Sequence, residues 1–133
     1  MRDDRTFEII GAAIEVHRTL GAGFLELVYQ EAMAVELTLR GIPFKRDVPF
    51  PIIYKGQSLG TPYRADFLAY GEIIIETKAV SNTNEHHVAQ VVNYLKAASL
   101  ATGLLLNFGQ STLEKRRVVF TSLSSSAPSP PSA

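Results

Sequence analysis

The chain has 133 residues, of which 46% are hydrophobic and 20% charged, a composition typical of one globular domain. It contains no cysteine, which excludes disulfides, zinc–thiolate sites and cysteine nucleophiles and favours a cytoplasmic location. The formal net charge is zero, which argues against a protein that coats nucleic acid by charge alone but is compatible with an enzyme whose basic groups are local.

Three helices are predicted from apolar residues that recur at three- and four-residue steps. The first covers residues 4–19 and the second about 25–40, where Gly41 stands at the position of a left-handed C-terminal cap. The third covers about 85–100, and polar residues at 82–84 offer N-terminal caps. None of these segments approaches the roughly 18 to 20 apolar residues of a membrane span, so no membrane partner is expected.

Five strands are predicted between and after these helices. Residues 43–54 contain three prolines, which indicates an edge strand or an irregular one. Residues 63–69 and 73–80 flank a turn, and residues 103–108 and 116–120 follow the third helix. The element order is therefore ααβββαββ, an α/β (α+β) fold with a mixed sheet.

Charged residues directly follow an apolar run in the strand at 73–80. Glu76 and Lys78 come after Ile73–Ile75, and because side chains alternate along a strand, both point to the same face. A three-residue turn at 70–72, with its central glycine in the left-handed region, would set Asp66 opposite Glu76. A two-residue turn would place Asp66 on the other face. The glycine favours the first register.

In this register the hairpin has one charged and one apolar face. The charged face carries Arg64, Asp66, Glu76 and Lys78, and the other carries Tyr63, Ala65, Phe67, Ile73 and Ile75. The two carboxylates and the Thr77 carbonyl are oxygen ligands suited to Mg²⁺ or Mn²⁺. Lys78 would orient or deprotonate the attacking water, or stabilise charge on phosphate oxygens. The pattern predicts metal-assisted phosphodiester hydrolysis. Its alternative is an ordinary hairpin with exposed salt bridges, since the spacing is loose.

Two helices offer further candidates. His86, His87, Gln90 and Tyr94 lie near one another on the third helix, and Gln90 with Tyr94 could touch a phosphate, a base or a metal-bound water. They could equally form a polar flank. The histidines are expected to be surface residues, because no third nitrogen or sulfur ligand for zinc is evident. Glu26, in the first turn of the second helix, is either a helix-dipole partner or a further metal ligand.

Several short motifs resemble those of one family. Gly-x-Gly-x-x-Glu-x-x-Tyr at Gly21, Gly23, Glu26 and Tyr29 is similar to the GxxExxY proteins, which are placed in the PD-(D/E)xK nuclease superfamily. The same order of motifs continues with Tyr63-Arg64-Ala65-Asp66, Ile75-Glu76-Thr77-Lys78-Ala79 and Gln90-x-x-x-Tyr94. The resemblance covers about residues 7–120. Ala65 stands where the superfamily's name has proline.

This resemblance implies a restriction-endonuclease-like core, a mixed sheet of about five strands flanked by helices. Position by position, it makes Glu26, Asp66, Glu76 and Lys78 catalytic, with metal held by Glu26, Asp66 and Glu76 together with the Thr77 carbonyl expected from the hairpin register. Gln90 and Tyr94 match the Q-x-x-x-Y element of nucleases similar to the RecB nuclease domain and would position substrate. Arg64 is a candidate phosphate contact or a brace for the carboxylates.

The function expected from the sequence is therefore that of a Mg²⁺-dependent nuclease acting on nucleic acid, DNA more than RNA. The alternative is a non-catalytic nucleic-acid-binding or assembly module that kept the fold. Residues 1–120 would form the nuclease-like domain, and the Ser/Pro-rich residues 121–133 would be disordered. So small a domain has little room for a sequence-reading element, which predicts weak sequence preference, a homodimer or a protein partner.

Overall fold

The computed structural model describes residues 3–121, and the predicted disordered tail therefore lies outside them except for its first residue. The three expected helices are present as α1 (Asp4–Leu20), α2 (Glu26–Leu39) and α3 (Glu85–Ala98). The strands are β1 (Phe44–Phe50), β2 (Ile53–Tyr54), β3 (Gln57–Ser58), β4 (Tyr63–Ala69), β5 (Ile73–Lys78), β6 (Thr102–Asn107) and β7 (Glu114–Val119). Within residues 3–121 no helix is long and apolar enough to span a membrane.

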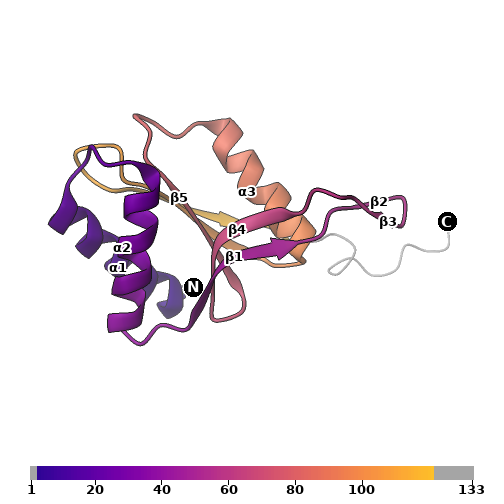
Figure 1. The fold of residues 1–133 in the computed structure, drawn as a ribbon, viewed down its shortest axis with the longest axis horizontal. Coiled ribbons are helices and arrows are strands. Elements are labelled where there is room, and N and C mark those ends of the chain that lie inside the picture. Colours follow the sequence, from indigo (N-terminus) through magenta and orange to yellow (C-terminus); the bar gives the residue numbers. More distant parts are fainter. Residues whose placement is uncertain (1–2, 122–133) are drawn as a thin grey trace.

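A five-stranded mixed sheet forms the centre of the molecule, in the order β1-β4-β5-β6-β7. β5 and β6 pair in parallel, and the neighbouring pairs β1–β4, β4–β5 and β6–β7 are antiparallel. Helix α3 connects the two parallel strands, as a parallel pair requires a crossover. α1 and α2 lie together on one side of the sheet and α3 on the other (Figure 1). The mixed α/β architecture predicted from the sequence is confirmed.

Each face of the sheet has its own apolar core. Under α1 and α2, the buried side chains of both helices pack on Phe67, Ile73 and Ile75. Under α3, Val91 and Leu95 pack on the opposite side of the same strands. Strand β5 is buried on both faces, which explains its unbroken isoleucine run.

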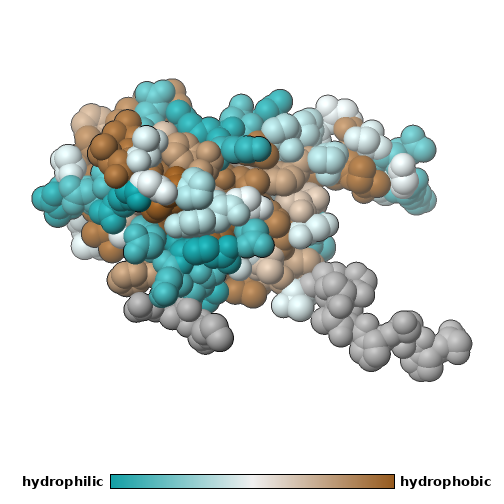
Figure 2. Space-filling view, turned by 90° about the horizontal axis from the view of Figure 1, so that it is seen from below, coloured by the Kyte–Doolittle hydropathy of each residue, from teal (hydrophilic) through white to brown (hydrophobic). Residues whose placement is uncertain are grey.

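The segment predicted as one irregular strand, residues 43–54, is divided in two. β1 ends at Phe50, and Pro51, which has no N–H to donate to a ladder, separates it from β2. β2 and β3 are each only two residues long, and they pair with each other to form a separate two-stranded sheet. This β2–β3 hairpin extends beyond the end of the main sheet, away from α1 and α2 (Figures 1 and 2).

The register of the β4–β5 hairpin is the predicted one, but the assignment of its faces is wrong in part. Ala69 faces Ile73 across the three-residue turn. Tyr63 and Ala65, however, pack in the α3 core, whereas Phe67 packs under α1 and α2. The strict alternation of β4 is broken at Asp66. On the paired strand β1, Asp47 adopts the left-handed region (φ 53°) between the pairs Arg46↔Phe67 and Val48↔Ala65, opposite the position where the alternation of β4 is broken.

Candidate active site

The candidate site lies where β4 and β5 diverge. Their backbone pairing extends from the turn only as far as Phe67 and Ile75. Beyond that point the side chains replace the ladder. Glu76 Oε2 accepts a hydrogen bond from the Asp66 backbone N–H at 3.0 Å, and Asp66 Oδ2 accepts one from the Thr77 N–H at 2.8 Å. The two carboxylates are thereby held side by side by the backbone of the opposite strand.

Two hydroxyl groups complete the support of these carboxylates. Thr77, which is fully buried, donates its Oγ1 hydrogen to Asp66 Oδ2 at 2.9 Å. Tyr63 donates its phenol hydrogen to Glu76 Oε2 at 2.6 Å. Tyr63 was not among the predicted site residues, because the alternation of β4 placed it on the opposite face. The interruption at Asp66 could not be read from the spacing.

Glu76 is the electrostatically perturbed member of the pair. Its side chain is buried, with 6% exposure. Burial, and next the negative charge of Asp66, raise the pKa of Glu76 to about 7, against the smaller lowering effects of the Tyr63 hydrogen bond and the Lys78 charge. A carboxyl group with this pKa is half-protonated near neutral pH, so a nearby cation would favour its ionised form.

Lys78 ends β5 two residues after Glu76 and is half-buried. Its ammonium lowers the pKa of both Glu76 and Glu26, which shows that it lies among the acidic side chains. For Glu26, burial is the larger influence and raises the pKa, and Asp66 adds to that rise. The structure therefore brings all four predicted catalytic residues into one electrostatic environment.

The Gly-x-Gly-x-x-Glu-x-x-Tyr segment positions Glu26 at the start of α2. Gly21 and Gly23 both have positive φ (72° and 114°), which side chains rarely tolerate. Tyr29 is fully buried, and its hydroxyl donates to the Gly21 carbonyl at 2.6 Å and accepts from the Phe24 N–H at 3.1 Å. The tyrosine thus ties the glycine loop to α2, whose first residue is Glu26.

The structure brings only some of the predicted substrate-binding residues to the candidate site. The Tyr94 ring stacks on the Tyr63 ring with a centroid distance of 3.3 Å, and burial followed by the Glu76 charge raises its pKa. Gln90, one turn earlier on α3, is half-buried. Arg64 is exposed and turns away from the carboxylates, since its Nη1 lies 3.6 Å from Asp47 Oδ2 and 3.4 Å from the Asp47 carbonyl oxygen.

A buried polar network follows directly after Lys78 and was missed by sequence reasoning. Asn107 is fully buried and exchanges two hydrogen bonds of 2.9 Å with the backbone of Val80. It also donates to Glu114, which accepts from the Thr83 hydroxyl at 2.6 Å. The network connects the loop between β5 and α3 to the ends of β6 and β7. An asparagine at the end of the apolar run at 104–106 was the available signal.

The carboxylate oxygens of Asp66 and Glu76 decide whether a divalent cation fits this site. In residues 3–121 the hydrogen bonds engage Oδ2 of Asp66 and Oε2 of Glu76, and the second oxygen of each accepts none. Two adjacent carboxylates of which one is buried suit a hard cation. No group of three or more His, Asp or Glu side chains within the described residues is arranged to hold a metal. Glu26 is therefore near the pair without completing a three-carboxylate cluster.

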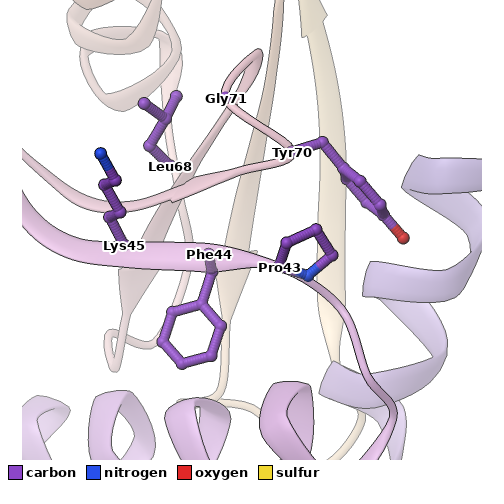
Figure 3. Close-up of a pocket in the computed structure, with 6 residues that line it drawn as sticks. All are labelled: Pro43, Phe44, Lys45, Leu68, Tyr70 and Gly71. Atoms are coloured by element: carbon purple, nitrogen blue, oxygen red, sulfur yellow. The ribbon is translucent and has the colours of Figure 1, made fainter.

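An apolar pocket lies apart from the carboxylates. It has a volume of about 430 Å³ and is lined by Pro43, Phe44, Lys45, Leu68, Tyr70 and Gly71. Figure 3 shows these residues around the start of β1 and the β4–β5 turn, with the Phe44 ring directed toward the helices. None of the candidate catalytic residues lines it.

Comparison with known proteins places the chain in a family. No curated protein matches it. A solved structure titled "Crystal structure of SSO0001" is similar, with 17% sequence identity, a TM-score of 0.49 and coverage of 90% of this chain and 80% of that one. The model of the PD-(D/E)XK nuclease superfamily matches residues 3–118, nearly all of the described chain. The chain therefore belongs to the PD-(D/E)XK nuclease superfamily.

Proposed function

We propose that this protein is a Mg²⁺-dependent nuclease that hydrolyses phosphodiester bonds in nucleic acid, with DNA as the preferred substrate. Membership of a nuclease superfamily supports this activity in general. The observation that carries the specific proposal is the pair formed by Asp66 and Glu76. Two carboxylates held together by backbone amides, one of them buried, are unfavourable as a pair of negative charges unless Glu76 is protonated or a cation occupies their unbonded oxygens.

The proposed metal ligands are Asp66, Glu76 and the Thr77 carbonyl, and Glu26, which lies near this pair, would join them when the metal binds. A bound divalent cation would supply Lewis-acid stabilisation of the phosphate oxygens and ease deprotonation of water. Asp66 is oriented by Thr77 and Glu76 by Tyr63, so neither carboxylate has to be ordered when substrate arrives. Preorganisation of this kind lowers the reorganisation required in the transition state.

The other groups act on substrate and water in this proposal. Lys78, beside the acidic side chains, would orient the attacking water and stabilise the charge that develops on the phosphate. Gln90 and Tyr94 on α3 would position the substrate next to Glu76. Arg64, on the exposed side of β4, would contact a phosphate further along the strand, beyond its ion pair with Asp47.

A non-catalytic nucleic-acid-binding or assembly module is the second candidate. It is favoured by the structural use of the carboxylates, each of which caps a backbone N–H where the strands diverge. Such a module would bind nucleic acid equally well with or without a divalent cation.

Metal binding coupled to cleavage tests the proposal. Mn²⁺ is titrated calorimetrically into the parent and into the Asp66→Ala, Glu76→Ala double variant, and cleavage of labelled DNA and RNA is followed in Mg²⁺. We expect the parent to bind Mn²⁺ and to cut DNA, and the double variant to do neither. A parent that binds no Mn²⁺, with or without a short duplex, and cuts nothing would support the non-catalytic module. The Glu8→Gln variant, an exposed change on α1, controls for the loss of a carboxylate.

A further inference from the structure

The β2–β3 hairpin exposes apolar side chains at a distance from the body of the molecule. Ile53, Tyr54 and Leu59 are 59%, 60% and 44% exposed. The backbone of the hairpin is bonded within itself, through the pairs Ile53↔Ser58 and Tyr54↔Gln57 and a bond from Leu59 N–H to the Ile52 carbonyl. In Figures 1 and 2 it stands clear at one end of the long axis. Apolar side chains grouped on such an extension indicate a contact surface.

The tip of the hairpin places a positive charge beside an aromatic ring. Lys55 and Gly56 both have positive φ (49° and 79°), the conformation of a two-residue type I′ turn. Asparagine, aspartate or glycine normally occupies the first of these positions, and a lysine there costs about 1 kcal/mol. The Lys55 Nζ lies 5.5 Å from the centre of the Tyr54 ring. The tip therefore combines an ammonium and an exposed ring at a local energetic cost.

The segment that includes the hairpin holds an excess of positive charge. Residues 43–64 contain four basic residues and one acidic residue, so their net charge is four minus one, +3, in a chain whose total is zero. These charged residues are all exposed: Lys45, Arg46, Asp47, Lys55 and Arg64. The outer edge of the sheet and its hairpin thus favour an anionic partner.

The base of the hairpin is continuous with the candidate active site. Phe50, the last residue of β1, stacks on Tyr63, the first residue of β4, with a centroid distance of 6.1 Å. The Tyr63 hydroxyl in turn binds Glu76. Gln57, the partner of Tyr54, precedes Asp66 by nine residues (66 minus 57), so at most about 30 Å separates them. A strand held at the carboxylates therefore has at most about 30 Å to span to reach the tip.

We propose that the β2–β3 hairpin binds an unpaired strand of nucleic acid beside the bond to be cleaved. A base stacks on the Tyr54 ring, a phosphate pairs with Lys55, and Ile53 and Leu59 cover the edge of the stacked base. An aromatic ring stacks on a base only where the base is free of its duplex neighbours, and such stacking tolerates any sequence. This inference rests on the proposed function for the identity of the polymer and adds that its single-stranded form is recognised.

Binding measured without cleavage tests the hairpin. The full chain in EDTA is titrated against a fluorescently labelled single-stranded DNA of about 20 nucleotides, followed by anisotropy. We expect Tyr54→Ala to weaken binding roughly tenfold, the loss of one base stack. We expect Lys55→Asn to weaken it about threefold, although asparagine suits the type I′ turn and preserves the hairpin. The control Lys115→Asn, the same charge change on β7 at the opposite edge of the sheet, should bind as the parent does.

Three results would overturn the inference. The first is that Tyr54→Ala, Lys55→Asn and the control Lys115→Asn all bind the single-stranded DNA with the same affinity. The second is that an unlabelled duplex of the same sequence displaces the labelled single strand as well as an unlabelled single strand does. The third is a change of Tyr54→Ala from dimer to monomer in gel filtration with unchanged affinity, which would make the hairpin an interface between copies.

The outcome is separable from that of the proposed function. A parent that binds the strand through Tyr54 and Lys55 but cuts nothing in Mg²⁺ would sustain the hairpin inference and refute hydrolysis. A parent that cuts nucleic acid while Tyr54→Ala binds and cuts as well as the parent would refute the hairpin inference alone. A parent that binds no nucleic acid would refute both.

Discussion

Lys78 is the residue whose removal separates metal binding from catalysis. Its ammonium lies among the acidic side chains, but it is not a ligand. Lys78→Ala should lower the cleavage rate by roughly 100-fold or more, the loss of one preorganised charge-stabilising group. The variant must be compared with the parent at about pH 8.5, because loss of the ammonium raises the pKa of Glu76 further and weakens metal binding at neutral pH.

Calorimetry with Mn²⁺ at the same pH checks that the metal site survives in Lys78→Ala. Asp66→Ala, by contrast, should lose both binding and cleavage. A Lys78→Ala protein that cleaves at the parent's rate would remove the lysine from the mechanism. An Asp66→Ala protein that binds Mn²⁺ as the parent does would place the metal elsewhere.

Glu76 makes the stability of the metal-free protein depend on pH. Its pKa in the folded state, about 7, lies above its ordinary value of 4.5. The stabilising contribution of the protonated form is therefore complete below about pH 4.5 and is lost as the pH rises through about 7. The difference between the two pKa values corresponds to on the order of 3 kcal/mol.

Urea unfolding in EDTA between pH 4.5 and 8 measures this effect as a difference between the parent and Glu76→Gln. The free energy of unfolding of the parent should fall relative to that of the variant across this range and level off above about pH 7. Titrating groups that do not interact with Glu76 cancel in the difference, because both proteins share them. A difference that stays constant with pH would show that Glu76 is not perturbed.

At the scale of elements, the loop between β5 and α3 is held by a close backbone contact. A Cβ on Gly109 would overlap the backbone of Val80, which follows Lys78 by two residues. Gly109→Ala should therefore cost about 1–3 kcal/mol of stability and displace the end of β5. Gly60→Ala is the matched control, because a Cβ there meets no atom within 4 Å.

Urea unfolding and the cleavage rate report the two consequences of Gly109→Ala separately. We expect both to change in Gly109→Ala and neither in Gly60→Ala. A Gly109→Ala protein as stable and active as the parent would mean that the loop shifts without consequence for the site.

The helices are predictable from sequence because each has one dominant period of apolar residues, and the central strands because each holds a short continuous apolar run. The three helices differ from their predicted ranges by one or two residues, and the three-residue turn at 70–72 fixed the β4–β5 register. The pairing of β2 with β3 escaped prediction, since a two-residue strand contains no period. The left-handed conformation of Asp47 and the break in the alternation of β4 also escaped prediction, because neither has a signature in spacing.

The same distinction applies to the site. The proximity of Asp66, Glu76 and Lys78 follows from register, which is a local property of one hairpin. The contact between Tyr63 and Glu76, 13 residues apart, depends on the break at Asp66, and the Asn107–Val80 bonds join segments 27 residues apart. Contacts of this kind require the assembled fold. The position of Glu26 beside Asp66 likewise depends on how α2 packs on the sheet.

For the whole molecule, a net charge of zero sets a limit on how nucleic acid is held. The basic residues of segment 43–64 are four in number, and the remaining charges of the chain sum to −3. Affinity for a single strand should therefore fall with salt with a log–log slope no steeper than about −3.5, since each of these four residues and Lys78 contributes about −0.7 when it neutralises a phosphate. Removing one contacting cation with Lys55→Asn should make the slope shallower by about 0.7.

Anisotropy titrations at four salt concentrations between 50 and 300 mM measure both slopes. Because Lys115 lies on β7, at the edge of the sheet opposite β1, Lys115→Asn should leave the slope of the parent unchanged. A parent slope well beyond about −3.5 would require phosphate contacts besides those of Lys78 and the 43–64 segment. Equal slopes for Lys55→Asn and the parent would mean that the ammonium at the hairpin tip does not meet a phosphate. The lysine in this left-handed position would then make a contact other than one with nucleic acid.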